Sequence, residues 1–246
     1  MRAPTSLTLY RRWLVGLALL TAALLTGYDA LNWGLGSLDT VRAARVATRL
    51  AASPSADTDD LVKFERAMAW LNRAEGRRGA LPDQSDLRGQ LLYWRAIHFA
   101  EPGPERGEGL AEAAREFRRA LAQRPAWPYF WANLALAKAE AGLFDEEFDR
   151  AVRRVYETGP WEPQLQLMMI RLGFVEGSRV GPESRALMDR LMVNAVQTQP
   201  LQVMALAGSP SQMAHICELI DNPALERRCA PFLEREDTPR AGQETF

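Results

Sequence analysis

Histidine and cysteine are nearly absent from this chain of 246 residues, which contains two of each. His98 and His215 are isolated, and no cysteine–histidine spacing suits zinc, so we expect no metal site. The cysteines do not form a C-x-x-C motif, which argues against redox catalysis. Glycine-rich phosphate-binding motifs and the G-x-S-x-G motif of a nucleophilic serine are also missing. The sequence therefore predicts a protein that is not an enzyme and that carries no catalytic, cofactor-binding or metal-binding residues.

An excess of charge of one sign is missing too. The 30 lysine and arginine residues nearly balance the 31 acidic residues, for a formal net charge of −1. Lys63 and Lys138 are the only lysines, a bias more typical of a GC-rich bacterial genome than of phosphate binding. A near-neutral chain has no global basic field, so we do not expect nucleic acid as a partner.

One long apolar run is present, and it lies near the N-terminus. Residues 13–28 contain no charged side chain. The preceding residues include Arg2, Arg11 and Arg12 and no acidic residue. As a helix the run would span about 24 Å, so flanking residues must extend it across the ~30 Å hydrocarbon core. Arginines at one end, and Tyr28 and Trp33 at the other, suit the two membrane interfaces.

This run predicts a cytoplasmic tail over residues 1–12 and a transmembrane anchor over residues 13–35. The arginines before the anchor place the N-terminus of a single-pass protein in the cytoplasm and its body in the periplasm, if the bacterium is Gram-negative. A cleaved signal peptide is the main alternative, but Tyr28 and Leu25 stand where cleavage after Ala30 or Gly27 would need small residues. The residues around Arg11 and Arg12 are not those of a twin-arginine signal. The run is apolar all round and lies at the extreme terminus, which argues against a buried helix of a soluble domain.

The remainder of the chain lacks the alternating β-branched pattern of strands and predicts an all-α fold. Residues 36–60 read as a helical linker that ends in a helix cap. Glycine and proline then divide the chain into short helices. We predict paired helices over residues 61–160, a C-terminal helical extension over residues 161–236 and a flexible tail over residues 237–246.

A repeat pattern appears within the paired helices. It consists of A-x3-F-x2-A-x4-P followed by W-x2-L-A, at Ala113, Phe117, Ala120, Pro125, Trp131, Leu134 and Ala135. Alanine permits close helix crossing, the aromatic side chain fills the groove between helices, and proline ends the helix. The pattern resembles the tetratricopeptide-repeat superfamily, in two to three degenerate copies over residues 61–160. The resemblance implies a protein-binding groove lined by the first helix of each pair. Glu147 and Arg154 depart from it, and generic antiparallel helices are the alternative.

A narrower resemblance comes from residues 124–148 (RPAWPYFWANLALAKAEAGLFDEEF) and 159–163 (GPWEP), behind one anchor and before two cysteines. This layout is similar to the small VpsP-type proteins of bacterial exopolysaccharide loci. It implies an accessory scaffold in the inner membrane, with polysaccharide polymerase or export components as envelope partners. The alternatives are an adaptor for respiratory-protein maturation or cell division, and a carbohydrate-active enzyme on a helical frame.

Two groups of side chains remain as candidate sites. Trp127, Tyr129 and Trp161 belong to an aromatic and proline-rich junction. We favour the interpretation that these rings fill the seam between helix pairs, and the alternative is an exposed surface that binds a partner or a sugar. Cys217 and Cys229 lie twelve residues apart. In an oxidising compartment a disulfide would join the last two helices, and two buried thiols or a redox pair are the alternatives.

Overall fold

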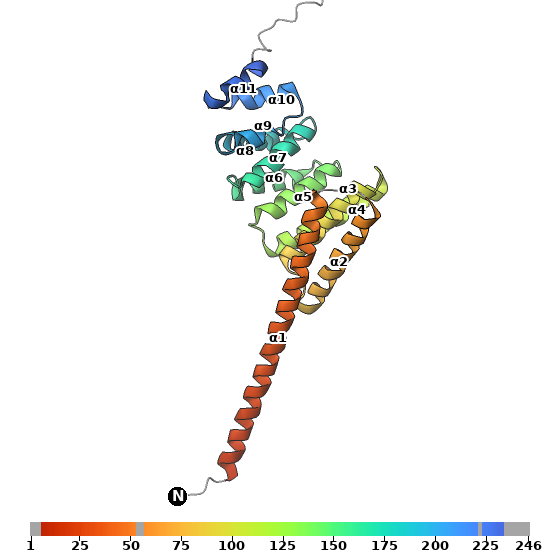
Figure 1. The fold of residues 1–246 in the computed structure, drawn as a ribbon, viewed down its shortest axis with the longest axis vertical. Coiled ribbons are helices and arrows are strands. Elements are labelled where there is room, and N and C mark those ends of the chain that lie inside the picture. Colours follow the sequence, from red (N-terminus) through yellow and green to blue (C-terminus); the bar gives the residue numbers. More distant parts are fainter. Residues whose placement is uncertain (1–5, 53–56, 221–222, 234–246) are drawn as a thin grey trace, which may run out of the picture.

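The computed structural model describes residues 6–52, 57–220 and 223–233, and over these residues the chain forms eleven α-helices and no strand (Figure 1). The first helix, α1, spans Ser6–Ala52 and is 47 residues long. The others are α2 (Thr58–Arg78), α3 (Pro82–Phe99), α4 (Pro104–Gln123), α5 (Pro128–Glu140), α6 (Glu146–Thr158), α7 (Pro163–Glu176), α8 (Pro182–Thr198), α9 (Pro200–Met204), α10 (Pro210–Glu218) and α11 (Pro223–Leu233). The predicted all-α fold class is confirmed.

The helix boundaries follow local sequence. Seven helices from α3 to α10 carry proline in their first turn, where the missing N–H has no intrahelical partner in any case. Asp57 and Asp145 cap α2 and α6 by accepting hydrogen bonds from backbone N–H groups of the first turn. Gly142, with φ of 73°, ends α5 in a left-handed conformation that favours glycine. These signals explain why so many short helices succeed one another.

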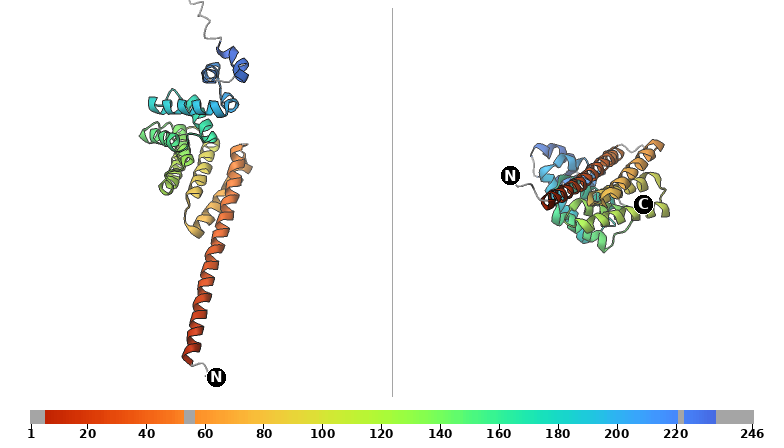
Figure 2. Two further views of the ribbon diagram at one scale, coloured as in Figure 1. Left: turned by 90° about the vertical axis from the view of Figure 1, so that its left-hand side faces the viewer. Right: turned by 90° about the horizontal axis from the view of Figure 1, so that it is seen from below.

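The helices stack in pairs along the long axis of the molecule (Figures 1 and 2). α1 packs on α2, α3 on α4, α5 on α6 and α7 on α8. The first helices of successive pairs also contact one another, in the order α1, α3, α5 and α7. Each pair therefore buries its apolar face against the next pair, as in an array of helical hairpins.

Most residues of the repeat pattern lie in this core. Ala113, Phe117, Ala120, Leu134 and Ala135 are buried. Phe117 packs against α3 at Gly89, where a Cβ atom would lie 2.6 Å from the phenylalanine Cε1 atom. Trp131 is half-buried between two core clusters, and Pro125 is exposed in the turn after α4.

The predicted anchor and most of the predicted linker form one continuous helix. Residues 36–52 of α1 pack on α2 and α3, with Ala43 and Leu50 buried. The indole N–H of Trp94 in α3 donates to the backbone oxygen of Leu50 at 3.2 Å. Towards its N-terminus α1 leaves the body and exposes its apolar side chains (Figure 1). Among the described residues it is the one helix long and apolar enough to cross a membrane.

Several sequence predictions fall partly outside the described residues. The flexible tail predicted over residues 237–246 lies wholly outside them. So do residues 1–5 of the predicted cytoplasmic tail, 53–56 of the linker, and 221–222 and 234–236 of the C-terminal extension.

Candidate interaction surfaces

Trp127, Tyr129 and Trp161, here called the aromatic edge, come from two neighbouring inter-helix turns. Trp127 and Tyr129 stand at the start of α5, and their ring centroids are 5.9 Å apart. Trp161 lies in the turn between α6 and α7. The next residue, Glu162, accepts a hydrogen bond from the Tyr129 hydroxyl at 3.3 Å. Burial, and then the Glu162 carboxylate, raises the pKa of Tyr129 above its usual value.

A glycine allows these two turns to approach each other. A Cβ atom at Gly159 would lie 2.8 Å from a methyl group of Leu165 and 2.9 Å from the ring of Pro128. Glycine at this position therefore brings the turn that carries Trp161 against the start of α5. The close approach creates a continuous edge from residues distant in the sequence.

The aromatic side chains near the start of α5 and in the turn before α7 lie partly in the core and partly on the surface. Phe130 is buried, and half-buried Trp131 donates its indole N–H to the backbone oxygen of Pro125 at 2.8 Å. These two rings pack in the seam between helix pairs. In contrast, Trp127 is 42% exposed and Trp161 is 64% exposed. Large exposed aromatic side chains next to a polar group are typical of surfaces that bind proteins or sugars.

A second candidate region lies along the first helices of the pairs. Here the buried side chain of Asp86 in α3 forms a hydrogen bond with α5. Its carboxylate accepts a hydrogen bond from the Asn133 amide of α5 at 2.8 Å and one from the Gln90 amide at 2.7 Å. Burial raises the pKa of Asp86 from 3.8 to about 6, against the lowering effect of both hydrogen bonds. The sequence contained no sign of this contact, because Asp86 and Asn133 are 47 residues apart.

Another contact between the same two helices lies nearby along this row. The Tyr93 hydroxyl of α3 donates to the Glu140 carboxylate of α5 at 3.4 Å. Burial, followed by the Glu140 charge, raises the pKa of Tyr93. The Tyr93 hydroxyl and the Glu140 carboxylate are therefore hydrogen-bond partners between α3 and α5.

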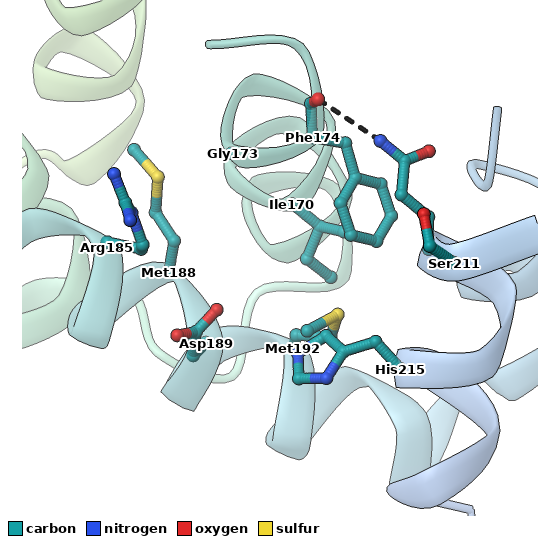
Figure 3. Close-up of a pocket in the computed structure, with 10 residues that line it drawn as sticks. Ile170, Gly173, Phe174, Arg185, Met188, Asp189, Met192, Ser211 and His215 are labelled. Atoms are coloured by element: carbon teal, nitrogen blue, oxygen red, sulfur yellow. Dashed lines mark hydrogen bonds between the residues drawn. The ribbon is translucent and has the colours of Figure 1, made fainter. Parts of the chain in front are cut away.

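A small hollow lies between α7, α8 and α10 (Figure 3). Its volume is about 270 Å³, at the lower limit of ordinary ligand pockets. Ile170, Phe174 and two methionines form much of its wall. The Arg185 guanidinium at its rim already donates to the backbone oxygens of Gly177 and Val180. One nitrogen of this guanidinium, Nη2, is therefore engaged by the fold.

A wider hollow of about 690 Å³ lies at the junction of α2, α3 and α4. Its polar lining mixes Glu105, Glu108 and Glu112 with Arg95 and Arg115. Its walls therefore carry both signs of charge and select no ligand class.

The carboxylates of Asp57, Asp59 and Asp60 approach within 4.8 Å of one another. The fold accounts for them, because Asp57 caps α2 and Lys63 pairs with Asp59 at 2.8 Å and with Asp60 at 2.9 Å. We therefore assign no metal site to this cluster.

Cys217 and Cys229 form a disulfide that joins α10 to α11, with their Cα atoms 5.4 Å apart. Both cysteines are buried. The bond therefore closes the last helical hairpin.

Comparisons with known proteins identify no relative: no family model, no curated protein and no solved structure matches the chain.

Proposed function

We propose that this protein is a membrane-anchored helical scaffold of a bacterial envelope, with tetratricopeptide-like helix pairs that bind other envelope proteins. Its α1 helix spans the inner membrane, and its body lies in the periplasm. The observation that carries the proposal is the aromatic edge. A folded array of helix pairs presents Trp127 and Trp161 to solvent at adjoining turns, and exposed tryptophans are the side chains that most often dominate protein–protein contacts.

Three observations support the location. The large apolar side chains of α1 from Trp13 to Leu31 are exposed, as expected for a segment that lies in lipid. The disulfide between Cys217 and Cys229 suits an oxidising compartment such as the periplasm. An N-terminal segment with arginines and no acidic residue suits the cytoplasmic side.

The polysaccharide role rests on the resemblance to VpsP-type proteins, carried by residues 124–148 and 159–163. These two segments contain the aromatic edge. We therefore propose that the edge contacts a polymerase or export component of extracellular polysaccharide synthesis.

In vivo photo-crosslinking tests this proposal directly. A photoreactive residue replaces Trp127 or Trp161 in the full-length protein, and adducts from native membranes are identified by mass spectrometry. Leu201 in α9 is the matched control, because it is an apolar side chain that is 50% exposed and lies outside the edge. We expect positions 127 and 161 to capture the same polysaccharide-synthesis component and position 201 not to capture it.

Other outcomes contradict the proposal in distinct ways. Division or haem-maturation proteins captured at both edge positions would overturn the polysaccharide role and retain the scaffold. Equal capture at all three positions, or none at any, would overturn the aromatic edge as the binding surface.

A further inference from the structure

A cluster of arginines lies at the end of the body from which α1 emerges. Arg73, Arg77 and Arg78 occupy the last two turns of α2, and we call them the arginine base. α2 runs back along α1, so its C-terminal end is the part of the body nearest the exposed length of α1 (Figures 1 and 2). The contact is close, because a Cβ atom at Gly36 would lie 3.2 Å from Cδ of Arg78.

The base holds more positive charge than its neighbours neutralise. Asp39 of α1 is 4% exposed, and its carboxylate contacts the guanidinium groups of Arg77, of Arg73 at 3.6 Å and of Arg42 at 3.5 Å. One carboxylate thus faces three cations. Arg78 adds a fourth cation, and no carboxylate pairs with it among the ion pairs of the described residues.

Other acidic groups nearby do not cancel this excess. Glu75 of α2 is engaged by Arg88 at 2.9 Å and by Arg119 at 2.6 Å, on the side towards α3 and α4. Asp29 is exposed on α1, about one helical turn before Trp33. With Asp29 included, the four arginines still exceed the carboxylates around them.

The arginines also have free hydrogen-bond donors. Arg78 stacks over the Trp33 ring at 3.0 Å from its centroid, and within the described part of the chain its side chain donates one long hydrogen bond, of 3.4 Å, to Ser37. Stacking uses the face of the guanidinium and leaves donors in its plane, which is the geometry that binds phosphate oxygens. The Arg73 side chain is 49% exposed.

The unbroken α1 helix sets the height of the base above the membrane. At about 1.5 Å per residue, the charge-free run from Trp13 to Tyr28 spans about 24 Å, and the arginines that precede it extend this length towards the ~30 Å of the hydrocarbon core. Trp33 then lies at the interface, where tryptophan is enriched. Because Arg78 stacks on Trp33, the base lies at the level of the lipid headgroups.

From this geometry we propose that the arginine base binds the phosphate groups of anionic phospholipids and so seats the body on the membrane surface. The inference rests on the proposed spanning of the membrane by α1. Its occupant is the lipid headgroup layer, because the anchor holds the cluster there.

The test compares phospholipid binding by full-length variants in native mass spectrometry, with phosphatidylglycerol and phosphatidylcholine as probes. Arg73→Gln with Arg78→Gln removes two cations and leaves Arg77, the closest partner of Asp39, in place. Arg227→Gln with Arg228→Gln is the matched control, because both arginines are exposed on α11 at the far end of the body. We expect the wild type and the control to prefer phosphatidylglycerol. The base variant should bind it about 30-fold more weakly, at about tenfold per 1.4 kcal/mol and ~1 kcal/mol for each arginine.

Equal phosphatidylglycerol affinity in the base variant and the wild type would overturn the inference. Equal loss by the control variant would overturn it too, since the effect would then be one of net charge. Inorganic phosphate that displaces the lipid at low millimolar concentration would show a free-anion site in place of a lipid surface. Thermal unfolding checks that the base variant is folded.

Alkaline carbonate extraction separates this inference from the proposed function. If the wild type is released from membranes, α1 does not span them and the anchoring itself fails. If it stays in the membrane while the base variant retains phosphatidylglycerol, only the lipid-binding inference fails.

Discussion

The buried carboxyl of Asp86 couples the stability of the body to pH. Its pKa in the folded protein is about 6, against 3.8 in an unperturbed chain. Between these values the folded state binds more protons than the unfolded state. The contribution of Asp86 to stability is therefore greatest below about pH 4, and is lost as pH rises through 6. Two pKa units correspond to about 3 kcal/mol of unfolding free energy.

Asp86→Asn should remove this dependence. The new amide keeps a partner on each side, because exposed Gln90 can turn its own amide over and accept. We expect the variant to be more stable than the wild type by up to about 3 kcal/mol at pH 7.5, and similar to it at pH 4. Urea unfolding at several pH values measures this difference, and parallel pH profiles for the two proteins would contradict it.

Residue-scale prediction from the sequence worked where the contact is local. The spacing of Ala113, Phe117 and Ala120 identified one helix face, and all three are buried. The same pattern marked Glu147 as a departure. In the structure Glu147 accepts from Arg118 of α4 and Lys138 of α5, each at 2.7 Å. Arg118, and then Lys138, lowers the pKa of Glu147 to about 2 despite partial burial. No local pattern reveals an ion pair between three helices.

At the scale of elements, the last helix depends on one covalent bond. α11 packs on α10 and on no other helix among the main contacts of the described residues. Its apolar contact with the rest of the array is therefore small. The disulfide between Cys217 and Cys229 supplies the missing restraint.

Replacing both cysteines with serine should loosen α11 without unfolding the array. A loop of this length contributes about 3 kcal/mol when it is closed, so amide exchange over residues 223–233 should quicken by about 100-fold. Hydrogen–deuterium exchange measures this change, with α5 as the internal reference. Unchanged protection of α11 would show that its packing, and not the disulfide, holds it.

The aromatic side chains near the start of α5 show what could not be predicted from the sequence of one element. Proline and glycine marked the turns correctly, since α5 and α7 both begin at proline. They did not reveal which rings face inwards. Phe130 is buried, whereas Trp127, three residues earlier, precedes the first turn of α5 and is exposed. The difference depends on tertiary packing, because Phe130 belongs to a core cluster that also contains Phe117 of α4.

At the scale of the whole molecule, the predicted anchor and residues 36–52 of the predicted linker form one continuous helix. The apolar run identified the part of α1 with no packing partner, because its composition alone separates it from the body. The continuation to Ala52 depends on Asp39, Ala43 and Leu50, which are buried only once α2 and α3 lie against them. A rigid helix fixes both the height and the rotation of the body relative to the membrane.

An insertion in α1 tests this rigid coupling together with the proposed lipid contact. Seven helix-forming residues of alternating charge, placed between Ala30 and Leu31, lengthen the helix by about 10 Å and rotate the body by only about 20°. The headgroup layer is about 5–8 Å thick on each side. We therefore expect the arginine base to rise out of it, and phosphatidylglycerol affinity to fall as in the Arg73→Gln, Arg78→Gln variant.

Seven glycine and serine residues at the same site form the matched control. Such a segment is flexible, with an end-to-end distance of about 15 Å, so the body can settle back onto the lipid and recover much of the phosphatidylglycerol affinity. The two insertions have the same number of residues and differ in stiffness and in the alternating charges of the helical insert. Recovery with the flexible insert and loss with the helical one would show that the continuous helix holds the base at the membrane. Equal affinity with both inserts would mean that α1 does not set the height of the body.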